Sequence, residues 1–276
     1  MTTSALLGRA DELATLTRLI DRLPEQGGAV VVLGEAGIGK TSLVRAAADY
    51  ARTRDALVLE TTGVEAEAQM PFAGLHQLLR PVMSSADRLP ARQWNALRAA
   101  FGMVECPPPE KFMIALATLN LLADAAAVRP VVLAVDDVQW LDRPTHEVIA
   151  FVARRVGPDP IVLIAAVRQG HPGPILEAGL PERRLSGLDA FAARKILDAT
   201  AADLTSGDRE RILRLALGNP LALVELPAAW RATGEPGRDP VPPLLPLTAR
   251  LELAFAGRVL AASRRILSGS STSEST

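Results

Sequence analysis

The stretch Gly34-Glu35-Ala36-Gly37-Ile38-Gly39-Lys40-Thr41 constrains this chain most, because it fits the pattern G-x-x-x-x-G-K-[ST]. In such a loop the glycines let successive backbone N–H groups point at a phosphate, the lysine reaches the outer phosphate oxygens, and the hydroxyl binds Mg²⁺. A chain of this composition and length would contain about 2 × 10⁻³ chance matches to the pattern. The alternative, an ordinary glycine-rich turn, is therefore disfavoured.

The residues on either side of the loop fit the same interpretation. Residues 29–33 form a short apolar run typical of a strand, and residues 41–48 are compatible with a helix. The positive N-terminus of that helix would lie at the phosphates. The predicted nucleotide-binding residues of this segment are Gly34, Glu35, Ala36, Gly37, Ile38, Gly39, Lys40, Thr41 and Ser42.

Strand-like and helix-like segments alternate along the first two thirds of the chain. Strands are predicted at 29–33, 56–61, 131–135 and 161–167, and helices at 7–24, 72–83, 91–101, 111–127 and 144–156. The run at 131–135 is apolar throughout, as in strands buried on both faces. This order predicts an α/β fold: a three-layer αβα sandwich of the P-loop NTPase type with a parallel sheet.

The pattern changes after residue 174. Three helices are predicted at 189–201, 206–217 and 220–230, the last bent or cut short at Pro227, with no strand among them. We therefore predict a P-loop ATPase core at 1–182 and a helical lid domain at 183–232. A proline-rich linker and terminal helix at 233–267 and a disordered tail at 268–276 would follow.

Charge and composition exclude several classes of protein. The formal net charge is −1 and no block of five basic residues occurs. This argues against a protein whose overall electrostatic field attracts nucleic acid. The single cysteine, Cys106, excludes an intrachain disulfide and a multi-cysteine zinc site. No signal peptide is indicated, and Asp124, Arg129 and Pro130 interrupt the most apolar window, 112–135. A cytoplasmic protein without a membrane span is expected.

Two acidic residues follow the apolar run at 131–135. Asp136 is expected to hold Mg²⁺ through water, and Asp137 to orient or deprotonate an attacking water. Many related ATPases have Glu at the position of Asp137. Because Asp has the shorter side chain, we expect slow hydrolysis.

Arg168 follows the strand at 161–167, where its side chain could reach a γ-phosphate; a solvated arginine at a strand end is the alternative. ATP is favoured over GTP because neither Lys111 nor Lys195 lies in the N-K-x-D pattern of guanine pockets. His76 and Trp140 are interpreted as packing residues, and His146 and His171 have no ligand partners nearby in sequence.

Five segments in a fixed order carry a resemblance to a known family. They are Leu7-Gly8-Arg9 with Glu12-Leu13, the loop 34–41, Pro71-Phe72-Ala73-Gly74-Leu75-His76-Gln77-Leu78-Leu79, Asp136-Asp137-Val138-Gln139-Trp140-Leu141-Asp142, and Gly218-Asn219-Pro220-Leu221-Ala222-Leu223. Over about residues 5–260 the chain resembles the N-terminal ATPase module of the large ATP-binding LuxR-type transcriptional regulators. These regulators are a branch of the STAND/AAA-like signalling ATPases.

The resemblance implies roles that spacing alone does not give. Arg9 would lie at the edge of the adenine or phosphate pocket, Pro220 would pack against adenine from the lid, and Arg168 would sense the γ-phosphate. ATP would clamp the lid to the core, and hydrolysis to ADP would change the angle between them. This switch would control assembly, so self-association or a partner protein is expected in the ATP state.

Members of the resembled family continue through helical repeats to a DNA-binding helix-turn-helix, for which these 276 residues leave no room. The sequence is thus expected to be a fragment, a truncated product or a stand-alone relative, and no direct DNA binding is expected from this chain alone. The leading hypothesis is a signalling switch that binds ATP or ADP with Mg²⁺ and hydrolyses ATP slowly. A nucleotide-binding scaffold that never hydrolyses and a P-loop phosphotransferase for a small molecule are the alternatives.

Overall fold

The computed structural model describes residues 6–104 and 109–232, which form two compact units. Of these described residues, 6–34, 40–104 and 109–185 belong to the first unit, and 35–39 and 186–232 belong to the second. Each unit is described by itself below. The predicted linker, terminal helix and tail at 233–276 lie outside the described residues, as does Cys106.

A parallel sheet of five strands forms the centre of the first unit, in the order β2-β3-β4-β1-β5. The strands are β1 (Gly28–Gly34), β2 (Leu57–Thr62), β3 (Val131–Asp136), β4 (Ile161–Arg168) and β5 (Glu182–Leu185). Gly34 is in register with Arg168 and Thr62 with Asp136, so the carboxyl ends of four strands meet at one edge of the sheet. This edge is where ligands bind in open parallel sheets.

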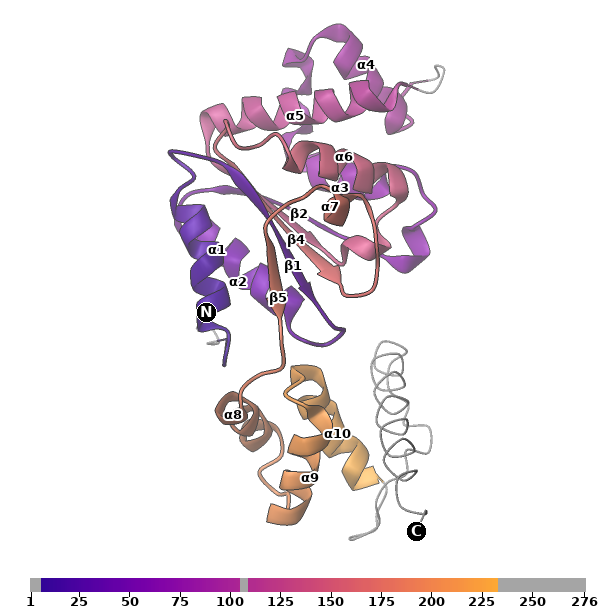
Figure 1. Ribbon diagram of the computed structural model, residues 1–276. Coiled ribbons are helices and arrows are strands. Elements are labelled where there is room, and N and C mark those ends of the chain that lie inside the picture. Colours follow the sequence, from indigo (N-terminus) through magenta and orange to yellow (C-terminus); the bar gives the residue numbers. More distant parts are fainter. Residues whose placement is uncertain (1–5, 105–108, 233–276) are drawn as a thin grey trace, which may run out of the picture. The chain divides into compact units, whose positions relative to one another are not determined.

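Helices cover both faces of this sheet, as Figure 1 shows. On one side lie α1 (Ala10–Asp21) and α2 (Lys40–Thr53), and on the other α3 (Ala73–Leu79), α5 (Lys111–Val128) and α6 (Arg143–Ala153). The remaining helical segments are η1 (Glu65–Glu67), η2 (Arg80–Arg88), α4 (Ala91–Ala100), η3 (Val138–Trp140) and α7 (Pro174–Glu177). The predicted three-layer α/β class is confirmed.

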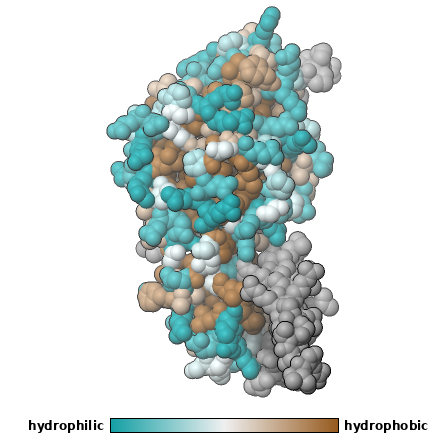
Figure 2. Space-filling view, in the orientation of Figure 1, coloured by the Kyte–Doolittle hydropathy of each residue, from teal (hydrophilic) through white to brown (hydrophobic). Residues whose placement is uncertain are grey.

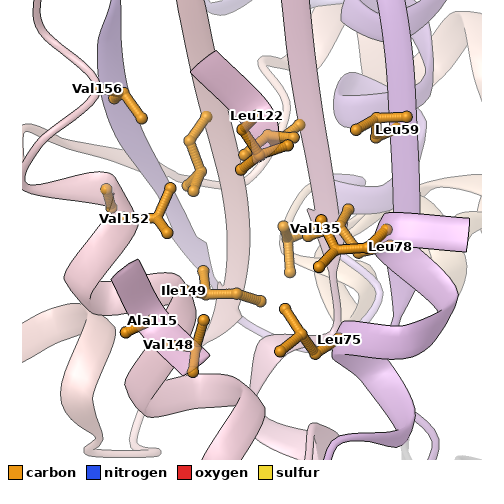
Figure 3. Close-up of a cluster of buried hydrophobic side chains, with 14 of the residues drawn as sticks. Leu59, Leu75, Leu78, Ala115, Leu122, Val135, Val148, Ile149, Val152 and Val156 are labelled. Carbon is orange, nitrogen blue, oxygen red and sulfur yellow. The ribbon is translucent and has the colours of Figure 1, made fainter. Parts of the chain in front are cut away.

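The main hydrophobic core fills the space between the sheet and α3, α5 and α6 (Figure 3). Leu59 and Val135 of the sheet, Leu75 of α3, Leu122 of α5 and Ile149 of α6 are each at most 1 % exposed. Burial of one such side chain stabilises a fold by roughly 1.5–3 kcal/mol. All six residues of β3 are buried, as the continuous apolar run predicts.

Asp142 joins two segments of the first unit that are about 70 residues apart in sequence. Its carboxylate accepts hydrogen bonds from Phe72 N (2.8 Å), Gly74 N (3.2 Å), Thr145 N (2.9 Å) and Thr145 Oγ1 (2.7 Å). It therefore caps α6 and also fixes the start of α3. A Cβ on Gly74 would lie 2.6 Å from Leu141 Cδ2, so a larger residue there would require the leucine side chain to move. The hydrogen bonds of Asp142 connect the segments 71–79 and 136–142, two of the five that carry the resemblance.

The described residues of the second unit contain three helices: α8 (Ala190–Thr200), α9 (Ser206–Ala216) and α10 (Pro220–Ala232). Asp189 caps α8 by accepting from Ala192 N (2.7 Å), and Thr205 caps α9 by accepting from Asp208 N (3.2 Å). Leu197, Ile212 and Leu223 are completely buried in a small core of their own.

Two predictions about individual elements are wrong. Residues Glu182–Leu185 form β5, whereas no strand was expected from 183 onward; three of its four side chains are exposed because it is an edge strand. The helix predicted at 72–83 ends at Leu79 and continues as a 3₁₀ segment, because Pro81 has no N–H for the α-helical bond. The helix α10 continues through Pro227 to Ala232, so it is not cut short at this proline.

One helix in the described part of the chain, α5, has the length and composition of a membrane span. Its residues Ile114, Leu121 and Leu122 are nevertheless buried in the core of the first unit. Core helices of soluble proteins pass the same test of length and composition. Figure 2 shows hydrophilic side chains spread over the visible surface, with smaller hydrophobic areas between them.

Acid should destabilise the first unit through His146. Burial lowers the pKa of His146 to about 4, and its Nε2 accepts a hydrogen bond from Ile175 N (3.2 Å), which requires the neutral ring. Because the unfolded chain binds this proton near pH 6.5, stability is lost as the pH falls from 6.5 towards 4. The expected loss is about 2 kcal/mol between pH 7.5 and pH 5.

Urea unfolding of the parent and of His146→Gln at both pH values measures this loss. The glutamine oxygen can accept from Ile175 N without titrating, so the variant should lack the His146 part of the pH dependence. Other groups contribute equally to both proteins and cancel in the difference. Identical pH dependence in the two proteins would show that His146 is not the cause.

Candidate functional site

The loop between β1 and α2 has the backbone that its glycines allow. Gly37 and Gly39 have φ values of 72° and 101°, in the left-handed region that side chains with a Cβ rarely adopt. Lys40 is the first residue of α2, so the positive end of this helix follows the loop directly. The sequence-predicted phosphate-binding segment thus has the local conformation that its chemistry requires.

Lys40 is anchored at the end of β1. Its side chain is only 7 % exposed, and Nζ donates a hydrogen bond to Gly34 O (3.0 Å). The same carbonyl accepts from Gln169 N (3.0 Å), which follows β4. The lysine charge is therefore held at the carboxyl end of the central strands.

Asp136, the last residue of β3, lies next to Thr41. The carboxylate is 8 % exposed and accepts hydrogen bonds from the Thr41 side chain and from Asp137 N (2.9 Å). Burial raises the pKa of Asp136, and the negative charge of Asp137 raises it further. The Thr41 hydrogen bond and the Lys40 charge oppose this rise. A bound cation would also stabilise the charged carboxylate.

These residues fit a magnesium ion. The Thr41 hydroxyl and the Asp136 carboxylate would supply two adjacent oxygen ligands, and Mg²⁺ typically takes only one or two protein oxygens while water and phosphate supply the rest. Within residues 6–104 and 109–232, no group of three His, Cys, Asp or Glu side chains is placed to hold a metal ion.

Asp137 adopts a left-handed backbone conformation (φ 46°, ψ 45°) immediately after β3. Its Oδ1 accepts a hydrogen bond from Gln139 Nε2 (2.9 Å), and Gln139 Oε1 accepts from Arg168 N (3.0 Å). The acid pair and the end of β4 are therefore connected through one side chain that the sequence analysis did not single out.

Two arginines of the predicted site lie in the first unit. Arg168 ends β4 and is half-buried; within the described parts of the chain, its guanidinium makes no hydrogen bond or ion pair. Arg9 precedes α1, is 3 % exposed and pairs with Glu12 (2.9 Å). Their predicted roles towards a nucleotide stay predictions.

Within the second unit, Asn219 binds the phosphate-loop segment. Its Nδ2 donates to Ala36 O (2.9 Å), and its Oδ1 accepts from Leu221 N (3.1 Å) and Ala222 N (3.3 Å). Leu221 N also donates a hydrogen bond to Gly37 O (3.2 Å). Pro220, which lies between Asn219 and Leu221 in the sequence, is the first residue of α10. Both contacts use carbonyl oxygens of the loop, whereas a phosphate would take its N–H groups.

Sequence reasoning missed Gln139, Asp142 and Asn219 as individual residues. All three lie inside the strings D-D-V-Q-W-L-D and G-N-P-L-A-L that carried the resemblance. Those strings were the only signal for them, because an isolated Asn, Gln or Asp gives no indication of its partners.

Comparison with known proteins agrees with this geometry. A family model described as "AAA ATPase domain" matches residues 5–164, more than half of the chain. The chain belongs to the AAA ATPase domain family. A curated relative of this AAA ATPase domain, the uncharacterized protein R02095 of Rhizobium meliloti (strain 1021), is 26 % identical over 221 residues. The match covers 70 % of this chain and 22 % of that protein.

Solved structures similar to this AAA ATPase domain include a STAND protein with a tetratricopeptide repeat sensor from Pyrococcus horikoshii. Its TM-score is 0.46 at 20 % identity, over 75 % of this chain and 28 % of that one. AMPPCP-bound DnaA from Aquifex aeolicus has a TM-score of 0.46 at 15 % identity, over 83 % of this chain and 63 % of that chain. The RuvB branch migration motor of Thermotoga maritima has a TM-score of 0.45 at 17 % identity, over 81 % of this chain and 62 % of that chain.

Proposed function

We propose that this AAA ATPase domain binds Mg²⁺-ATP and hydrolyses it slowly to ADP and phosphate as a signalling switch. The observation that carries the proposal is the meeting of Lys40 and Thr41 with the Asp136–Asp137 pair at the carboxyl ends of β1 and β3. Lys40 would bind the outer phosphates, Thr41 and Asp136 the magnesium ion, and Asp137 the attacking water.

Further residues complete the proposed site. Arg168 would contact the γ-phosphate from the end of β4, and Arg9 and Pro220 would border the adenine or phosphate pocket. The loop residues 34–39 and Ser42 would supply the phosphate-facing backbone. We assign the first unit, which extends to Leu185, to the ATPase core and residues 186–232 to a lid. The Asn219–Ala36 contact supports a link between lid and loop.

The signalling context is proposed from the resemblance to LuxR-type regulators. The chain spans about a quarter of the length of the STAND structure to which it is similar. We propose that a cytoplasmic regulator uses this domain as its ATP-dependent switch. The ATP state would favour self-association or binding of a partner protein, and DNA would not bind to these residues.

A single-turnover assay with excess protein and γ-labelled ATP tests the proposed chemistry. Mg²⁺-dependent release of ADP and inorganic phosphate supports the switch. Recovery of unchanged ATP from a stable complex would overturn hydrolysis and favour the non-hydrolysing scaffold. Label on a small-molecule acceptor would favour a phosphotransferase. An Asp136→Asn control should bind less Mg²⁺ and release little phosphate.

A further inference from the structure

Gln139 is the one side chain that bridges the acid pair and the end of β4 among the hydrogen bonds described above. Its Nε2 donates to Asp137 Oδ1 at 2.9 Å, and its Oε1 accepts from Arg168 N at 3.0 Å. Gln139 lies in the 3₁₀ turn η3 directly after β3, and it is partly buried. The NH₂ end of the Gln139 amide thus binds the residue that follows β3, and its oxygen binds the last residue of β4.

The direction of this amide follows from its partners. A backbone N–H can only donate, so the oxygen of Gln139 must face Arg168 N. The NH₂ end then faces Asp137 Oδ1, which accepts its hydrogen bond. One amide orientation therefore satisfies both contacts, and Gln139 fixes the position of the Asp137 side chain.

The same hydrogen bonds continue to the phosphate-binding residues. Arg168 is in register with Gly34, whose carbonyl accepts from Gln169 N and from Lys40 Nζ. On the other side, Asp137 N donates to Asp136, which accepts from the Thr41 side chain. Gln139 thus links the end of β4 to the acid pair through its side chain, in addition to the backbone pairing of β3 with β4.

We propose that Gln139 is a positioning residue for ATP hydrolysis, which holds the Asp137 side chain in place relative to the strand end that carries Arg168. The inference rests on the proposed function. In the step it serves, the water oxygen bonds to the γ-phosphorus, and the bond to the β–γ bridging oxygen breaks. ADP keeps that electron pair, and Asp137 takes the proton from water. Gln139 contacts none of these atoms and acts through Asp137.

Two variants of Gln139 distinguish a role in positioning Asp137 from a role in stabilising the fold. Gln139→Met keeps the side-chain length and removes both hydrogen bonds. Gln139→Glu keeps the acceptor for Arg168 N and replaces the donor by a negative charge opposite Asp137. Gln93→Met is the matched control, because Gln93 is a buried glutamine in α4 whose oxygen accepts from Asn120 Nδ2 (2.9 Å) far along the chain from the acid pair.

Both Gln139 variants should bind Mg²⁺-ATP within about threefold of the parent affinity, while the single-turnover rate falls about 100-fold, the usual contribution of a placed general base. Amide hydrogen exchange at Arg168 should accelerate in Gln139→Met and stay slow in Gln139→Glu. Gln93→Met should hydrolyse ATP at the parent rate.

The outcomes distinguish this inference from the proposed function. A parent that leaves ATP unchanged overturns proposed hydrolysis, and the positioning role falls with it. If the parent hydrolyses ATP and Gln139→Met does so at the same rate, the positioning role alone is wrong. It is also wrong if Gln139→Met loses ATP affinity and thermal stability in proportion to its rate, because a merely structural residue gives that result.

Discussion

Replacing Lys40 by Ala is expected to abolish stabilisation of the protein by Mg²⁺-ATP. Lys40 Nζ is held at the end of β1, 3.0 Å from Gly34 O and beside the carboxylate of Asp136. A nucleotide at 100 times its Kd stabilises a protein by about 2.7 kcal/mol, which corresponds to roughly 5–10 °C in Tm for a unit of this size. Removal of the only side-chain cation in the loop should eliminate this increment at the same concentration.

Differential scanning fluorimetry with and without Mg²⁺-ATP measures the effect. Lys195→Ala is the matched control, since Lys195 is exposed on α8 and its ammonium lies over the Phe191 ring at 4.7 Å. The Lys195→Ala variant should retain the full increase in Tm that Mg²⁺-ATP causes in the parent. Because two units are present, the ATP-dependent transition is the one to compare. An equal shift in Lys40→Ala and the parent would show that the phosphate site lies elsewhere.

Asp142→Ala is expected to destabilise the first unit by about 4 kcal/mol. The carboxylate is 2 % exposed and accepts four hydrogen bonds, three of them from backbone N–H groups. Truncation leaves these donors buried without an acceptor and removes the cap of α6. Amide exchange at Phe72 and Gly74 should accelerate before global unfolding, because α3 loses its fixed start.

Urea unfolding compares this variant with two others. Asp142→Asn keeps the shape and one acceptor oxygen, so we expect about half the loss. Asp124→Ala removes the same charge from an exposed position on α5 and should change stability by less than about 0.5 kcal/mol. If Asp142→Ala is no less stable than Asp124→Ala, the hydrogen bonds of Asp142 contribute nothing to the fold.

Local sequence patterns were sufficient for most of the fold. The apolar runs that became β1, β3 and β4 lie at the centre of the sheet, where both faces are buried and the chemistry of each residue is constrained. The edge strand β5 was missed because its residues Glu-Arg-Arg-Leu are mostly exposed and show no strand pattern. The helix end at Leu79 was missed because the apolar spacing continues past it into the 3₁₀ segment that contains Pro81.

For the candidate site too, some features could be predicted from the sequence and others depend on the tertiary structure. The sequence by itself determined the phosphate loop and the acid pair, because each is a short run whose backbone and side chains act together. Only the tertiary structure decided their partners: Gln139 meets Arg168 N, Asp142 meets Phe72 N, and Asn219 meets Ala36 O across 183 positions of sequence. Hydrogen bonds form within about 3 Å, and no local periodicity specifies which distant backbone group arrives at that distance once the sheet and helices have packed.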